Sequence, residues 1–145
     1  MGESIVSRIV ALKRLCSLQE EQIRSRFNLS SAEYAALCVL DDNVAVSCKE
    51  LAGRMYLSPS RGSRVIARLV AAGYVREFDG SADRRVHHLE LTPQGVQIRQ
   101  CIAEQKALCE QSIIAGCSAA ELAQLKKSLD LLVGLLSKRE SAHGA

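Results

Sequence analysis

Hydrophobic residues recur every three to four positions through most of this chain, a spacing that predicts amphipathic helices. The pattern divides into six helical segments, expected at about 3–27, 30–40, 47–55, 58–72, 92–115 and 118–138. In the segment at 58–72, we expect Val65 or Ile66, Leu69 and Ala72 to point inward. The chain therefore predicts a mainly helical fold.

Polar residues with strong capping preferences mark where these helices begin. Three capping boxes are expected, in which a serine is followed three residues later by a glutamate: Ser30 with Glu33, Ser47 with Glu50, and Ser118 with Glu121. Two further starts, Ser58-Pro59 and Thr92-Pro93, place proline at the first helical position, where its missing N–H costs nothing. Gly73 and Gly116 are expected to end helices.

A short stretch between two of the helices has strand character instead. Residues 74–78 and 86–91 are rich in aromatic and β-branched residues, and turn-forming residues at 79–83 separate them. His87 and His88 are neighbours in the second strand, so their side chains are expected on opposite faces. Two short helices followed by a β-hairpin predict a winged helix-turn-helix lobe over 30–91, within a single domain at 1–145.

The helices at the two ends of the chain, 1–27 and 93–138, lie outside that lobe. The last helix carries Leu122, Leu125, Leu129, Leu132 and Leu136, whose alternating steps of three and four suit packing against another helix. Additional apolar residues widen this face beyond what one partner helix would cover. We interpret both ends as a dimerisation region of a homodimer; the alternative is packing within one chain.

The excess of positive charge lies in the middle of the chain. Residues 47–91 hold eight basic and five acidic residues, whereas the remainder holds eleven of each, so the net charge of +3 belongs to this stretch. A local basic excess is typical of phosphate binding. No apolar run approaches a membrane span, and the N-terminus lacks a signal-peptide pattern, so we expect a cytoplasmic protein without membrane contact.

The helix that follows Ser58 has the composition of a DNA-recognition helix, and the hairpin could contribute a second contact. Small polar residues allow close approach to a groove, arginine can pair with guanine or phosphate, and Ser47 could position a phosphate for the preceding helix. The alternative for the arginines is a solvated helix face, and for Asp83 and Arg85 a surface ion pair. The expected DNA-binding residues are Ser47, Ser58, Pro59, Ser60, Arg61, Ser63, Arg64, Arg68, Asp83, Arg84 and Arg85.

The central stretch LAGRMYLSPSRGSRVIARLVAAGYVREFDGSADRRVHHLELTPQG resembles the MarR family of winged helix-turn-helix transcription regulators. The resemblance is carried by LA before SPS, by SRVIARLVAAGYV, by the D-R-R of the wing, and by LxLTPQG opening a long helix. It implies a homodimeric repressor that reads a pseudopalindromic operator in double-stranded DNA. By position, Arg85 would enter the minor groove, Asp83 would orient it, and Arg84 would lie near phosphate.

Two residues depart from the family pattern. Tyr56 occupies a turn position where the family usually has glycine, and Gly62 occupies a usually apolar position inside the recognition helix. We expect Gly62 to allow close approach to Met55, or to leave the helix loose until DNA orders it.

Six cysteines raise the question of what releases the protein from DNA. The resemblance implies a small-molecule effector, and cysteine oxidation is the other hypothesis, with Cys16, Cys101, Cys109 and Cys117 as candidates. Cys117, at the bend between the last two helices, is expected to be the most exposed thiol. The histidines lack ligand spacing, so no metal site or cofactor is expected.

Two other function classes compete with a DNA-binding regulator. An enzyme is disfavoured because the chain contains no P-loop, nucleophile elbow, HExxH motif or dinucleotide-binding glycine pattern. A winged-helix module that binds another protein, without specific DNA binding, remains as the alternative. Such a module would not need the exposed arginines.

Overall fold

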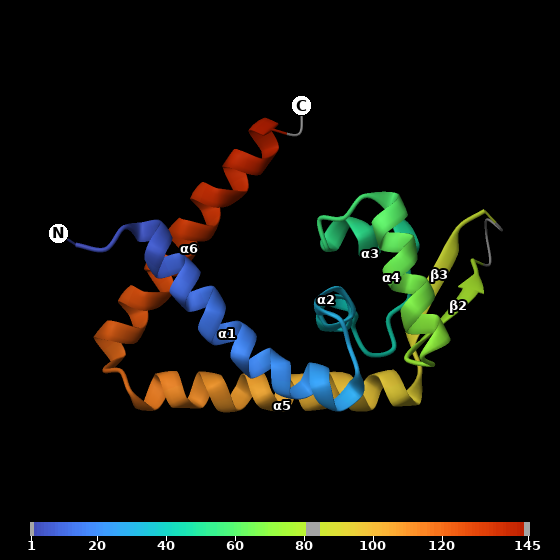
Figure 1. Ribbon diagram of the computed structural model, residues 1–145, viewed down its shortest axis with the longest axis horizontal. Helices are drawn as coiled ribbons and strands as arrows, with labels where there is room; N and C mark the ends of the chain where they lie inside the picture. The colour runs from blue at the N-terminus through green and yellow to red at the C-terminus, as the bar shows by residue number, and fades with distance from the viewer. Residues whose placement is uncertain (1, 81–84, 144–145) are drawn as a thin grey trace. The chain divides into compact units, whose positions relative to one another are not determined.

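A computed structural model describes residues 2–80 and 85–143 of the chain and divides it into two compact units, Met1–Gln105 and Lys106–Ala145. The prediction of a mainly helical fold with a small β wing is confirmed (Figure 1). The elements in order are α1 (Ile5–Phe27), α2 (Ser31–Val39), β1 (Val46–Ser47), α3 (Cys48–Arg54), α4 (Pro59–Ala71), β2 (Val75–Asp79), β3 (His87–Leu91), α5 (Pro93–Ala115) and α6 (Ala119–His143).

The expected capping residues begin the helices of the first unit. Ser30 and Ser47 form complete capping boxes with Glu33 and Glu50, and the Ser58 hydroxyl accepts a hydrogen bond from the backbone N–H of Arg61. At α5, the Thr92 hydroxyl accepts from the backbone N–H of Gly95. Each cap satisfies an N–H group that the first helical turn leaves without a partner.

The core of the first unit lies where α2, α3 and α4 pack together and against the sheet. Leu37, Leu40, Leu51, Leu69 and Leu89 are almost completely buried there. Branched aliphatic side chains fill this space because the chain has few aromatic residues. Burial of each such side chain contributes about 1.5–3 kcal/mol to folding.

The inner face of α4 follows the predicted spacing except at its end. Val65, Ile66 and Leu69 are all buried, but Ala72 is exposed, so the prediction that Ala72 points inward is wrong. The helix ends at Ala71, and Ala72 is its C-cap. The next residue, Gly73, has a left-handed φ of 79°, which ends the helix there and leaves Ala72 at its exposed end.

The sheet has three antiparallel strands in the order β1-β3-β2, one more than the sequence predicted. In it, Val46 pairs with Leu89 and Ser47 with His88, while the β2–β3 hairpin pairs Val75 with Leu91 and Asp79 with His87. The strand that the sequence did not predict, β1, has only two residues, which is too short to show an alternating pattern. It joins the wing to the start of α3.

The second unit contains the C-terminal part of α5 and all of α6. Gly116 follows α5, and Ser118 with Glu121 forms the predicted capping box, in which Glu121 Oε2 accepts from the Ser118 N–H at 2.8 Å. Many apolar side chains of α6 are exposed in the single chain, including Leu131 and Val133. Over the described residues, no helix combines the length and the hydropathy needed to cross a membrane.

Candidate nucleic-acid interface

The N-terminal turn of α4 presents small polar side chains beside the start of the helix. Ser58 Oγ lies 3.3 Å from Ser60 Oγ, and Pro59 occupies the first helical position. Ser58, Pro59, Ser60 and Ser63 are all exposed. The free N–H groups and the positive end of the helix dipole at this turn favour an anion.

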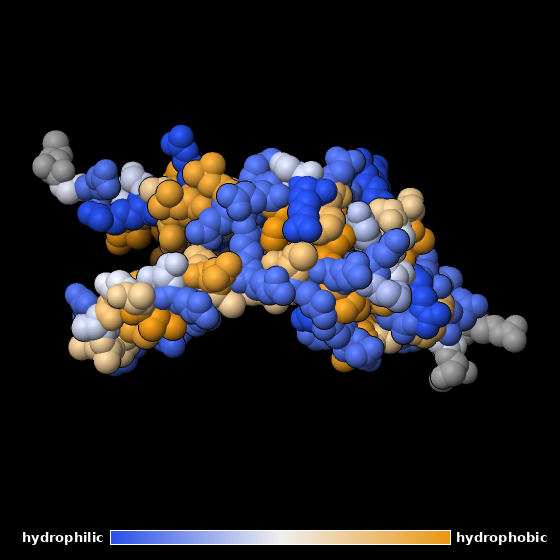
Figure 2. All heavy atoms as spheres, turned by 90° about the horizontal axis from the view of Figure 1, so that it is seen from below, coloured by the Kyte–Doolittle hydropathy of each residue, from blue (hydrophilic) through white to orange (hydrophobic). Residues whose placement is uncertain are grey.

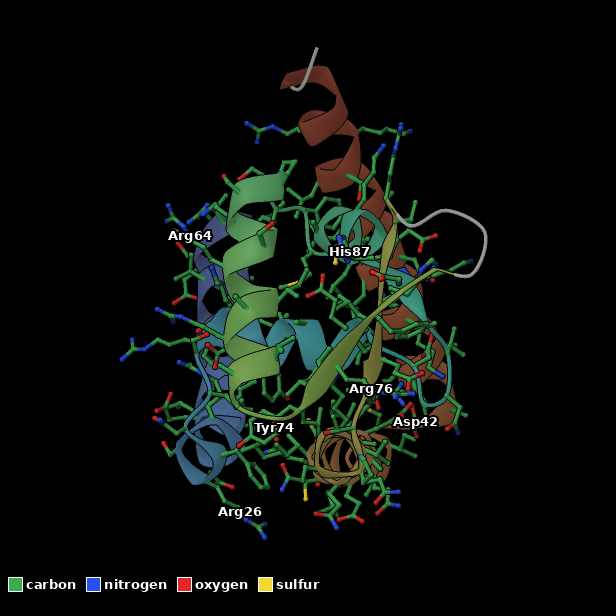
Figure 3. All side chains as sticks on the ribbon, turned by 90° about the vertical axis from the view of Figure 1, so that its right-hand side faces the viewer. Arg26, Asp42, Arg64, Tyr74, Arg76 and His87 are labelled. Atoms are coloured by element: carbon green, nitrogen blue, oxygen red, sulfur yellow. The ribbon has the colours of Figure 1, made fainter. Side chains whose placement is uncertain are left out.

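Two arginines extend from the outer side of the same helix. Arg61 and Arg64 are exposed, and within residues 2–80 and 85–143 neither guanidinium has a hydrogen-bond or ion-pair partner. Figure 3 shows Arg64 pointing away from the two wing strands. Both arginines are therefore exposed, as the sequence predicted, and available to an external anion, while their contact with DNA stays a prediction.

Arg68, the third predicted arginine, is engaged within the protein. Its Nη1 lies 3.7 Å from Glu33 Oε1, which belongs to α2. Glu33 is the only buried charged residue recorded over the described part of the chain, with 8% of its surface exposed. From the sequence, Glu33 is predicted only as a capping residue, because nothing in the spacing signals a contact between residues so far apart in the chain.

Gly62 allows α3 and α4 to approach each other closely. A Cβ atom added to Gly62 would lie 2.6 Å from the Cβ of Ala52. The close approach is thus to Ala52 and not to Met55, which corrects the prediction. Met55 instead is the half-buried C-cap of α3, at the far end of that helix from Ser47.

Tyr56 lies in the turn of the helix-turn-helix in a conformation that suits glycine. Its φ is 54°, in the left-handed region, and 84% of its surface is exposed. A residue with a Cβ pays about 1–2 kcal/mol for this conformation. The turn therefore keeps the geometry that glycine would give, at a cost in stability.

Ser47 has two structural roles at the start of α3. It belongs to β1, and its hydroxyl accepts from the Glu50 N–H at 3.1 Å while its own N–H donates to Glu50 Oε2 at 2.9 Å. These hydrogen bonds lower the pKa of Glu50. Ser47 is half-buried, so its side chain is only partly accessible for the predicted contact with a phosphate.

The wing presents different chemistry on its two faces, and the predicted opposite orientation of the two histidines is confirmed. His87 Nδ1 lies 3.5 Å from both Glu77 Oε1 and Asp79 Oδ1, on the face that also carries Leu89. His88 stacks on Phe78 on the other face, with ring centroids 5.8 Å apart.

The predicted wing-tip residues fall mainly outside the described part of the chain. Asp83 and Arg84 are among the residues that the structure does not describe, so their predicted contacts stay predictions. Arg85 is exposed at the end of the described part of the loop.

Two grooves border the N-terminal end of α3, and both include Cys48 and Ser63 in their lining. One, of about 420 Å³, runs along α4 toward Val70 and Glu77; the other, of about 470 Å³, lies beside Leu57 and Pro59. Cys48 Sγ lies 3.8 Å from Glu77 Oε1, and burial, together with this carboxylate, raises the pKa of the thiol. A raised pKa reduces the thiolate fraction, so Cys48 is not an activated nucleophile.

The four cysteines proposed for a redox role do not follow the predicted order of exposure. Cys16 is exposed, whereas Cys101, Cys109 and Cys117 are half-buried, so the expectation that Cys117 would be the most exposed thiol is wrong. Over the residues described here, no group of three His, Cys, Asp or Glu side chains is arranged to hold a metal ion.

Comparison with known proteins finds a match to one family model. Residues 29–87 match the model of the MarR family. The chain is thus similar to the MarR family over this part of its length. The match covers α2, β1, α3, α4 and β2 and ends at the first residue of β3. Members of this family are regulators of transcription that bind DNA through a winged helix, as the sequence resemblance implied.

Individual relatives with low sequence identity are regulators of transcription. The chain is 24% identical over 140 residues to the transcriptional repressor MprA of Escherichia coli, covering 90% of this chain and 80% of MprA. It is 26% identical over 108 residues to an uncharacterized HTH-type transcriptional regulator, YsmB of Bacillus subtilis, covering 74% of each protein.

Solved structures share the same fold. The crystal structure of Streptococcus pneumoniae FabT in complex with DNA matches with a TM-score of 0.85 and 24% identity, over 92% of this chain and 96% of FabT. A MarR protein from Peptoclostridium difficile matches with a TM-score of 0.80 and 16% identity, over 96% of this chain and 91% of that protein. At these identities, the likeness shows the fold of the chain.

Proposed function

We propose that this protein is a MarR-type homodimeric repressor that binds a pseudopalindromic operator in double-stranded DNA. The observation that carries the proposal is the two-sided character of α4. Its inner face, with Val65, Ile66 and Leu69, is buried in the core, while Arg61 and Arg64 on its outer side have no partner among the described residues. A rigidly held helix with available cations suits insertion into a major groove.

The proposed binding mode assigns a role to each predicted residue except Arg68. Ser58, Pro59, Ser60, Arg61, Ser63 and Arg64 would face the major groove, and Ser47 would contact a phosphate at the start of α3. Arg85 would enter the minor groove, with Asp83 orienting it and Arg84 near phosphate. FabT, which shares the fold, was solved in complex with DNA, and this supports DNA as the proposed ligand.

The dimer is supported by apolar surface that a single chain leaves open on each of two helices. On α1, Ile5, Val6 and Leu15 are exposed, and Figure 2 shows hydrophobic surface, in orange, toward the N-terminal end of the chain. On α6, Leu131, Val133 and other apolar residues are exposed as well. Exposed apolar surface of this extent marks an interaction site, and a second copy is the proposed occupant.

Release from DNA is proposed to follow binding of a small-molecule effector. Support comes from the fold relative NadR, solved in complex with 4-hydroxyphenylacetate, which matches with a TM-score of 0.70. Cysteine oxidation is the second hypothesis, and the exposed Cys16 is the most accessible of its four candidates. Oxidant should then lower DNA affinity, and the Cys16→Ser variant should resist; unchanged binding after oxidation would remove the hypothesis.

The direct test is fluorescence anisotropy with DNA from upstream of the protein's own gene, titrated at two salt concentrations. Tight, salt-sensitive binding that exceeds binding to scrambled DNA supports a sequence-specific regulator. Equally weak binding to both DNAs requires a genome-wide search for the operator. If no bound site emerges from that search, a protein-interaction role replaces the proposal.

Charge reversal tests the site itself. Arg64→Glu and Arg85→Glu should abolish DNA binding while leaving the dimer intact, because each places a carboxylate where phosphates approach. Lys106→Glu, an exposed position outside α3, α4 and the wing, changes the net charge equally and should retain binding. Survival of DNA binding in both arginine variants would show that the site is assigned wrongly.

A further inference from the structure

The ion pair between Arg68 and Glu33 joins the recognition helix to the helix behind it. Arg68 lies in the last turn of α4, about 10 Å along the helix axis from Arg61. Its guanidinium is well exposed, with 72% of the side chain accessible, but its Nη1 lies 3.7 Å from Glu33 Oε1. Of the three arginines on this side of α4, it is the one with an ion-pair partner in the described structure.

Glu33 is held so that one carboxylate serves two helices. Its Oε2 accepts a hydrogen bond from the backbone N–H of Ser30 at 3.1 Å, which completes the capping box of α2. Its Oε1 is left facing Arg68. Because the residue is buried, the carboxylate has little water around it, and a buried charge requires a partner.

The position of Arg68 on its own helix also favours an internal role. Residues that read base edges lie at the N-terminal end of a recognition helix, whereas Arg68 is at the C-terminal end. A cation there is stabilised by the negative end of the helix dipole. Two local sources of negative potential, Glu33 and the end of α4, therefore compete with DNA for this guanidinium.

We infer that Arg68 is a positioning residue, which with Glu33 fixes the angle of α4 against α2, and not a contact to DNA. The inference rests on the proposed function, since α4 must enter the groove for its angle to matter. It changes the role predicted for Arg68 from the sequence and adds Glu33 to the residues on which recognition depends. Arg61 and Arg64 remain the DNA contacts of this helix.

The test compares salt dependence and specificity for four variants by anisotropy: Glu33→Gln, Arg68→Gln, the double variant, and Arg64→Gln as the matched control. Glutamine retains the capping box at residue 33 while removing the charge. Each lost phosphate contact lowers the slope of log Kd against log salt concentration by about 0.9. We expect Arg64→Gln to lower this slope and Arg68→Gln to leave it unchanged.

Affinity should show that Glu33 and Arg68 act as one unit. Each single substitution should weaken operator binding by about threefold to tenfold, and the double variant should be no weaker than the weaker single variant, because coupled residues are not additive. Binding to scrambled DNA, which depends on phosphates alone, should not change.

The failure of this inference can be distinguished from the failure of the proposed function. If the wild-type protein binds operator and Arg68→Gln lowers the salt slope while Glu33→Gln has no effect, Arg68 contacts phosphate and the inference is wrong. If the wild-type protein shows no salt-sensitive binding to any DNA, the regulator proposal itself fails and the inference falls with it.

Discussion

At the scale of single residues, Tyr56 shows how a turn can be retained with an unfavourable side chain. We predict that Tyr56→Gly increases the free energy of unfolding by about 1 kcal/mol, because glycine adopts a positive φ without a steric cost. Urea denaturation provides the measurement, and Tyr56→Ala is the control, since it removes the ring but keeps the Cβ. Equal stability of the two variants would show that the backbone conformation is not the cause.

Gly62 offers the opposite case, where a glycine is required by a neighbour. Gly62→Ala should lower the free energy of unfolding by about 1 kcal/mol, because overpacking against Ala52 outweighs the better helix propensity of alanine. Adding Ala52→Gly should restore part of the loss by reopening the space. Gly53→Ala in α3, where an added Cβ meets nothing within 4 Å, should instead stabilise the protein. Stabilisation by Gly62→Ala would contradict the packing argument.

At the scale of elements, the capping boxes couple helix stability to pH. Hydrogen bonds from Ser47 lower the pKa of Glu50, and those from Ser118 lower the pKa of Glu121. A carboxylate whose pKa is lower in the folded state stabilises the fold above its unfolded pKa, and this contribution is lost as pH falls through the folded value. The box-forming glutamates should therefore make the protein less stable in acid.

The measurement is the urea midpoint at pH 6 and at pH 3.5 for the wild type and for the Glu50→Gln, Glu121→Gln double variant. Glutamine keeps the capping geometry without a titrating group. The wild type should lose more stability between the two pH values than the double variant does. An identical loss in both proteins would show that other carboxylates account for the acid sensitivity.

How far the elements could be predicted from the sequence depended on whether their signals were local. Ser30, Ser47, Ser58 and Ser118 specify helix starts through hydrogen bonds that span three residues, so these starts could be predicted from the sequence. β1 could not be found in the same way, because a two-residue strand exists only through its pairing with β3.

Contacts between helices could not be predicted from the sequence pattern either. Helical spacing placed Arg61, Arg64 and Arg68 on one side of α4 but could not show that Glu33 on α2 engages only the last of them. The same limit explains why Gly62 was expected against Met55 and is found against Ala52. Periodicity indicates which side of a helix faces inward, whereas the partner on that side is decided by packing.

At the scale of the whole molecule, the apolar side chains that remain exposed on α6 require a partner. Leu131 and Leu135, separated by one helical turn, are exposed in the single chain, with 65% of Leu131 accessible. Burying such side chains contributes about 1.5–3 kcal/mol each. A protein that kept this surface open to water would be prone to associate without specificity.

We predict that the wild-type protein has twice the mass of the chain in solution and that Leu131→Glu with Leu135→Glu yields a folded monomer. Light scattering coupled to size-exclusion chromatography measures the mass, and circular dichroism tests the fold. Gln124→Glu, on the same helix, adds negative charge at an exposed polar position and should remain dimeric. When one chain of a dimer binds its half-site, the effective concentration of the second chain at the other half-site rises, so the dimer binds the full operator more tightly than one chain does. The monomeric variant should therefore lose affinity for the full operator but keep its weak affinity for a half-site. A variant that is monomeric yet binds the full operator as tightly as the wild type would show that recognition needs only one chain.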